Sequence, residues 1–277
     1  MKKSLLLFTV FFAFQLSAQV TIPRVSQKAS LSQTIALTEI TLNYSRPQVK
    51  GRKIFGGLEP YGKVWRTGAN EVTTISFSTD VKINGFYLKA GKYALVSLPT
   101  EKDWTFIFNK DADQWGAFSY NDSLDALRIL AKKEVIPNKE VLSFYFEELT
   151  QNSVKVVLEW ETVRLSFTVE ADPMTVVAAI QKSLVNRKPT DWRSLYNAAN
   201  YCFTSDVNHE EAQQWLNSSL EIRKDAGTYF LKAKLAKQVK SNKDAKAFAE
   251  VAKEIAKKEE NPNKQLISDV EEFLKTL

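Results

Sequence analysis

Residues 154–169 read VKVVLEWETVRLSFTV and place large apolar side chains at alternate positions. The apolar positions are Val154, Val156, Leu158 and Trp160, followed by Val163, Leu165, Phe167 and Val169. Polar side chains such as Lys155, Glu159, Arg164 and Thr168 stand between them. Successive side chains of a strand point to opposite faces, so this alternation is typical of strands with one face in a core and one in water.

The same alternation recurs upstream, as far as Ser30. It occurs within residues 40–44, 75–83 and 142–146, and the intervening turn signals are Asn84-Gly85, Ala90-Gly91, Pro99-Thr100 and Gln151-Asn152-Ser153. An Asn-Gly pair between two apolar runs favours a tight β-hairpin. Many short strands without a long helix among them predict an antiparallel sandwich or barrel, and we assign a β-sandwich domain to residues 22–170.

The periodicity changes from two to that of a helix at Asp172-Pro173. Asp172 is suited to cap a helix and Pro173 to occupy its first turn. Helical spacing then predicts six helices, at residues 174–186, 191–203, 208–223, 229–240, 243–258 and 264–277. The domain 172–277 is therefore expected to be all-α, either tetratricopeptide-like helical hairpins or a plain bundle. The fold class is α+β, with strands and helices segregated along the chain.

The first eighteen residues have the three-part pattern of an export signal. Met1-Lys2-Lys3 is basic, residues 4–16 are uncharged and mostly apolar, and Ser17-Ala18-Gln19 supplies small residues for cleavage near Ala18 or Gln19. About 13 apolar residues are short for a bilayer core of about 30 Å. We expect a periplasmic or secreted product without a membrane span after cleavage. No cysteine stands directly after the apolar run, so lipid attachment is not expected.

Composition excludes several classes of function. The formal net charge of +6 is spread along the chain, which predicts no nucleic-acid partner. His209 is the only histidine and is predicted to lie at a helix start, so a histidine-dependent triad or multi-histidine zinc site is excluded. Cys202, the only cysteine, is predicted to be buried in the helical part. We expect no metal or cofactor, while catalysis by paired carboxylates stays open.

A long Gly- and Pro-containing stretch, residues 46–71, is the first candidate binding region. Long loops without secondary structure are often functional, and guanidinium groups beside aromatic rings suit carboxylate, phosphate or sugar ligands. The candidates here are Arg46, Tyr61, Trp65, Arg66, Asn70 and Glu71. The alternative is structural: Trp65 fills the sandwich end, Gly68 is left-handed, and Arg66 pairs with Glu71.

Residues 108–120, FNKDADQWGAFSY, form the second candidate region and contribute Lys110 and Trp115. A tryptophan beside Asn, Asp and Gln side chains suits a stacked sugar ring. The alternative is a connecting loop packed by its own aromatic residue. Asp111 and Asp113 lack the glycine and the distal glutamate of a calcium loop, so no metal is predicted here.

Several of these segments resemble a known family. PYGKVWRTGANE from Pro60, AGKYALVSLP, FIFNKDADQWGAFSY and VLEWETVRLSFTV are similar to the domain-of-unknown-function family 2911, over about residues 22–170. The resemblance implies export, a β-rich domain and a tetratricopeptide-like tail. It brings no established activity and no catalytic residues, so it leaves the question of an enzyme open.

Three functions are compatible with the sequence. The leading hypothesis is an exported binding protein that holds a small anionic or carbohydrate ligand and docks a protein partner through its helical tail. The first alternative is an extracytoplasmic hydrolase that uses Glu71 or another carboxylate with a Lys or Arg electrophile. The second is an assembly scaffold that acts through residues 172–277.

Overall fold

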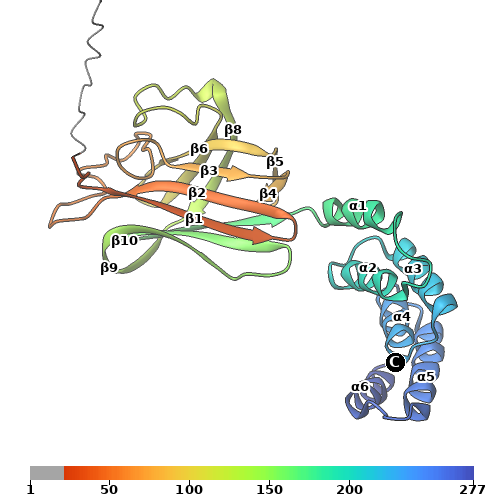
Figure 1. The fold of residues 1–277 in the computed structure, drawn as a ribbon. Helices are drawn as coiled ribbons and strands as arrows, with labels where there is room; N and C mark the ends of the chain where they lie inside the picture. The colour runs from red at the N-terminus through yellow and green to blue at the C-terminus, as the bar shows by residue number, and fades with distance from the viewer. Residues whose placement is uncertain (1–21) are drawn as a thin grey trace, which may run out of the picture.

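The structure is a computed structural model that describes residues 22–277. Two antiparallel sheets occupy its first part and six helices follow in a separate group, which confirms the segregated α+β fold (Figure 1). The predicted export signal, residues 1–18, lies outside the described residues. No helix within residues 22–277 is both long enough and apolar enough to cross a membrane.

The β-part contains a six-stranded and a four-stranded sheet. The larger sheet has the order β1 (Gln27–Ile35), β2 (Thr38–Arg46), β3 (Thr74–Phe77), β6 (Gly91–Leu98), β7 (Asp103–Asn109) and β8 (Asp125–Lys132). The smaller has the order β5 (Phe86–Leu88), β4 (Val81–Ile83), β10 (Ser153–Ala171) and β9 (Glu134–Glu147). Asn84 and Gly85 form the two-residue turn between β4 and β5, both with positive φ (48° and 83°), so the hairpin prediction is confirmed.

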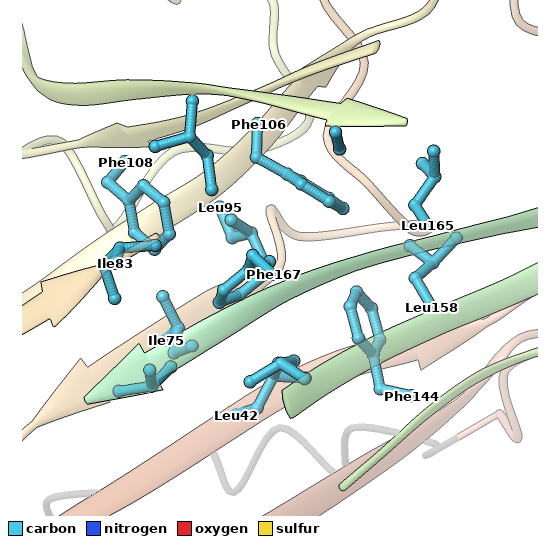
Figure 2. Packing of buried hydrophobic residues seen from close by; sticks show 14 of the residues in the cluster. Leu42, Ile75, Ile83, Leu95, Phe106, Phe108, Phe144, Leu158, Leu165 and Phe167 are labelled. Atoms are coloured by element: carbon cyan, nitrogen blue, oxygen red, sulfur yellow. The ribbon is translucent and has the colours of Figure 1, made fainter. Parts of the chain in front are cut away.

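The hydrophobic core lies between the two sheets. Leu42, Leu95 and Phe106 of the larger sheet face Phe144 and Phe167 of the smaller one (Figure 2). Fully burying one such side chain stabilises the fold by about 1.5–3 kcal/mol. The inward side chains of β1 and β2 alternate with outward ones, so the outer face of the larger sheet carries short polar side chains.

Strand β10 contains a bulge at the point where its sequence pattern changes phase. The apolar positions are even-numbered up to Trp160 and odd-numbered from Val163, and the register with β9 shifts on both sides of Glu161. Glu161 has φ 53°, and both Trp160 and Val163 remain buried. The extra residue therefore keeps both halves facing the core. The Glu161 carboxylate accepts a hydrogen bond from the Ile54 N–H and so ties the bulge to the loop after β2 (3.0 Å).

The six helices follow the predicted ranges to within a few residues. They are α1 (Pro173–Leu184), α2 (Trp192–Thr204), α3 (His209–Ile222), α4 (Ala226–Gln238), α5 (Asn242–Lys258) and α6 (Lys264–Lys275). Asp172 caps α1 by accepting from the Met174 N–H at 2.9 Å, as predicted. Cys202 is buried in the helical core, also as predicted. Asn152, in the turn before β10, contacts Ser205 and Tyr201 and links the β-part to the helices.

Candidate functional site

The loop between β2 and β3, residues 47–73, is anchored to the core through Trp65. Its backbone exchanges two hydrogen bonds with Ser97 of β6, at 2.7 and 2.8 Å. The indole is 3% exposed, and its ring centre lies 5.7 Å from Phe55, 6.1 Å from Trp104 and 5.7 Å from Trp160. Trp65 therefore belongs to a buried aromatic cluster, which favours the structural alternative for this residue.

Arg46 and Asn70 act as tethers. The Arg46 guanidinium donates to the Leu142 carbonyl at 3.1 Å and to the Ser143 hydroxyl at 2.9 Å, which joins β2 to β9. The Asn70 amide donates to the Ser26 carbonyl at 3.2 Å and also reaches the Ser45 hydroxyl. Both side chains hold segments of backbone in place.

Gly68 is required for a reason other than the predicted left-handed conformation. Within two positions of Gly68, the left-handed residues are Thr67 and Asn70, with φ 54° and 61°. Gly68 itself is not left-handed. A Cβ on Gly68 would lie 2.8 Å from the Thr73 hydroxyl oxygen. The Gly68 carbonyl also accepts the Trp65 indole N–H at 3.1 Å. Close packing, and not backbone conformation, makes glycine necessary at this position.

The predicted pair between Arg66 and Glu71 is wrong. Glu71 instead pairs with Arg24 at 2.6 Å and with Lys28 at 3.1 Å, both of which precede or begin β1. The hydrogen bond from Arg24 is the main cause that lowers the pKa of Glu71 to about 2. The partner lies far away in sequence, so the spacing of the loop residues could not identify it.

A cavity of about 520 Å³ lies on the outer face of the larger sheet. We call it the sheet-face cavity. Its floor consists of short polar side chains from β1, β2 and β3, namely Ser30, Asn43, Ser45 and Thr74. Two ion pairs stand at its edge, Lys28–Glu71 at 3.1 Å and Lys92–Asp113 at 2.8 Å. The charges of these pairs neutralise one another, so the remaining polar groups of the cavity are neutral, and they share its wall with apolar side chains such as Ala29 and Val72.

Gln114 and Trp115 lie beside this cavity. Gln114 lines it, is 6% exposed, and donates from its amide nitrogen to the Asp111 carbonyl at 2.9 Å. Among residues 22–277, no group donates a hydrogen bond to its buried side-chain oxygen. The next residue, Trp115, is 57% exposed and forms a β-bridge with Glu71. The Arg24 guanidinium lies 5.9 Å from the Trp115 ring centre.

A second cavity, of about 350 Å³, is enclosed mainly by the loop after β2. We call it the loop cavity, and the lining residues that matter below are Lys50, Arg52, Glu59, Arg66 and Trp160. Burial raises the pKa of Glu59 from 4.5 to about 7, although Arg66 and Arg52 attract its charged form. The sheet-face and loop cavities share no lining residue.

The eight residues predicted as ligand contacts do not meet in one place. Glu71 lines the sheet-face cavity and Arg66 the loop cavity, whereas Arg46 and Lys110 line neither. Tyr61 is partly exposed and packs over Gly56. The sequence analysis missed Arg24 and Glu59 as candidates. No sequence signal identifies them, because their importance comes from burial and from a distant partner.

The single histidine of the sequence, His209, lies in the helical part. The imidazole of His209 lies 3.0 Å from the Asp206 carboxylate at the start of α3. Within residues 22–277, no group of three or more His, Cys, Asp or Glu side chains is arranged to hold a metal ion. The two cavities of the β-part are therefore the candidate sites.

Comparison with known proteins identifies one family. The model of a family described as "Protein of unknown function (DUF2911)" matches residues 26–169, just over half of the chain and nearly all of the β-part. No curated protein and no solved structure matches the sequence.

Proposed function

We propose that this chain, which belongs to the DUF2911 family of unknown function, is an exported, non-catalytic protein that binds a sugar-like ligand in the sheet-face cavity. The export part of the proposal is supported by the three-part pattern of residues 1–18. The binding part is supported by the chemistry of the cavity.

The observation that carries the proposal is the unsatisfied side-chain oxygen of Gln114. A buried acceptor without a donor costs about 1–3 kcal/mol. This oxygen is itself buried, in a side chain that lines the sheet-face cavity, so a hydroxyl group of a ligand could supply the missing donor once the Gln114 amide turns toward the cavity. Pockets that bind small molecules use a few such convergent polar groups to orient the ligand.

The surroundings of Gln114 fit a neutral polyhydroxylated ligand. The floor contributes two hydroxyl groups and an amide from Ser30, Thr74 and Asn43, each able to donate and accept. Trp115 presents an exposed ring beside the cavity, with the Arg24 guanidinium 5.9 Å from its centre. An exposed aromatic face of this kind suits the apolar side of a sugar ring.

The hydrolase alternative receives no support from Glu71. A pKa of about 2 means that this carboxylate stays ionised at neutral pH. It is consequently a poor general acid and a weak general base there, since efficient catalysis needs a pKa near the working pH. Its two cation partners make it a structural element of the cavity edge.

The test is a screen of the protein against a glycan array, followed by calorimetric titration with the best mono- or disaccharide. We expect Asn43→Ala and Trp115→Ala each to weaken binding by about tenfold, which corresponds to about 1.4 kcal/mol. Phe118→Ala is the matched control, because Phe118 is an 86% exposed aromatic residue three positions after Trp115, whereas Trp115 forms a β-bridge with Glu71 of the cavity wall. A full array without a binding sugar, or equal affinity in all three variants, would contradict the proposal.

A further inference from the structure

The loop cavity is a second site with a different chemistry. Three cationic side chains, Lys50, Arg52 and Arg66, line it together with the single carboxyl group of Glu59. Its charge is therefore positive whether or not Glu59 is ionised, in contrast to the neutralised edge of the sheet-face cavity.

The two guanidinium groups are held in place yet keep free donors. The Nε of Arg52 donates to the Val49 carbonyl at 2.9 Å and its Nη2 to the Gln48 carbonyl at 2.5 Å, which fixes the direction of the side chain and leaves Nη1 without an acceptor among residues 22–277. Arg66 is half-buried, and its Nε is fully buried without an acceptor among residues 22–277. A terminal nitrogen of Arg66 lies against Gly116, where a Cβ would come within 3.1 Å. The buried Nε is out of reach of a ligand, so the terminal N–H groups of the two guanidinium groups are the donors that match the two oxygens of a carboxylate.

Glu59 faces these cations without a direct partner. Its backbone is fixed by hydrogen bonds with Ile54 and Gly56, each 2.9 Å long. Its carboxyl group makes no hydrogen bond or ion pair with any residue of the described chain, although Arg66 and Arg52 are close enough to attract its charge. In its protonated form this group has an O–H to donate.

The exposed apolar side chains of Val25 and Leu58 line the same cavity, together with the buried Trp160. The ring of Trp160 is 1% exposed and stacks on Trp65 within the aromatic cluster. The indole N–H has no acceptor among residues 22–277, although the residue lines the cavity. A carbon chain would find contact with Val25 and Leu58, which a bare inorganic anion would not use.

We infer that the loop cavity binds a small organic carboxylate, with its charged oxygens on Arg66 and Arg52 and a further oxygen accepting from the carboxylic acid of Glu59. This site is independent of the proposed sugar site, because the two cavities have no residue in common.

Binding at this site should depend on pH through Glu59. The cations around it are Lys50, Arg52 and Arg66. Two further carboxylates nearby already accept backbone hydrogen bonds: Glu140 from the Lys50 N–H and Glu161 from the Ile54 N–H. Glu59, with its pKa raised to about 7 by burial, titrates between pH 6 and 8. Its protonation removes a negative charge and adds a donor, so affinity for a carboxylate rises about tenfold from pH 8 to pH 6.

The experiment is calorimetric titration of the full chain with succinate, and separately with sulfate, at pH 6 and pH 8. Succinate is expected to bind about tenfold more tightly at pH 6, and more tightly than sulfate. Glu59→Gln should bind succinate equally at both pH values. Arg66→Gln and Arg52→Gln should each weaken binding at least tenfold, and Lys110→Gln, an exposed basic residue that lines neither cavity, should leave it unchanged.

Several outcomes would overturn the inference. They are the absence of succinate binding at pH 6, an unchanged pH dependence in Glu59→Gln, and equal affinity for sulfate and succinate. Circular dichroism of each variant separates lost binding from lost folding. If Arg66→Gln does not fold, the affinity of Arg52→Gln for succinate tests the role of the guanidinium groups. Because sugar binding is measured with other variants, failure of this site leaves the proposed function standing, and the reverse also holds.

Discussion

Replacing Glu59 by glutamine should stabilise the protein at alkaline pH. Glutamine has the same shape as protonated glutamate but cannot ionise, so the substitution removes the cost of a charged group in a partly buried place. Burial raises the pKa of Glu59 from 4.5 to about 7. The folded state therefore holds this proton more tightly than the unfolded chain does.

The sign and the size of the effect follow from that shift. Between pH 4.5 and 7 the unfolded chain has lost the proton while the folded protein keeps it, so the free energy of unfolding falls as pH rises and levels off above pH 7. A rise of about 2.5 units corresponds to about 3.4 kcal/mol. Glu59 keeps part of its surface in water, and screening reduces the effect to about 1.5–2 kcal/mol.

The measurement is urea unfolding of wild type and Glu59→Gln at pH 4.5 and pH 8. Tryptophan fluorescence reports on the β-part through the cluster of Trp65, Trp104 and Trp160. We expect the variant to be more stable by about 1.5–2 kcal/mol at pH 8 and equal to wild type at pH 4.5. At about 2–4 °C per kcal/mol, the thermal midpoint at pH 8 rises by roughly 3–8 °C.

Glu71→Gln is the matched control with the opposite sign. The pKa of Glu71 is lowered to about 2, so its ionised form contributes stability above pH 4.5 that is lost as pH falls through 2. At pH 8 this variant should lose up to about 1 kcal/mol, as expected for an ion pair near the surface. If Glu59→Gln were less stable than wild type at pH 8, or more stable by the same amount at both pH values, the reasoning about Glu59 would be refuted.

Two further substitutions test the packing of the same loop by urea unfolding. Trp65→Ala should lower the free energy of unfolding by about 3–5 kcal/mol because it empties part of the aromatic cluster. Trp115→Ala, on the surface, should change the free energy of unfolding by less than about 0.5 kcal/mol. Similar losses in both variants would argue against the burial of Trp65. Gly68→Ala should cost about 1–3 kcal/mol, since its Cβ would lie 2.8 Å from the Thr73 hydroxyl oxygen. A neutral Gly68→Ala would show that the loop can move away from the added methyl group.

The sequence alone predicted the fold class, the six helices and part of the strands. The alternating run within residues 75–83, continuous in the sequence, forms two strands, β3 and β4, in different sheets. Alternation of apolar side chains located β2, β3 and β10 because a strand must present one face to the core. Asn84-Gly85 predicted the β4–β5 hairpin, and Asp172-Pro173 predicted the start of α1, because both depend on backbone and capping preferences within a few residues. The bulge of β10 is also visible in the sequence, because the alternation of apolar residues shifts by one position between Trp160 and Val163.

The tertiary structure decided what the loop residues do. Trp65 and Trp115 are both tryptophans in Gly-containing segments, yet one is in the core and the other is on the surface. The partner of Glu71 proved to be Arg24, 47 residues away, instead of Arg66. Glu59 became a candidate only when its environment was visible. The physical reason is the same in each case: periodicity shows which face of a strand is buried, whereas desolvation and charge pairing in a loop depend on chain segments that only the folded structure brings together.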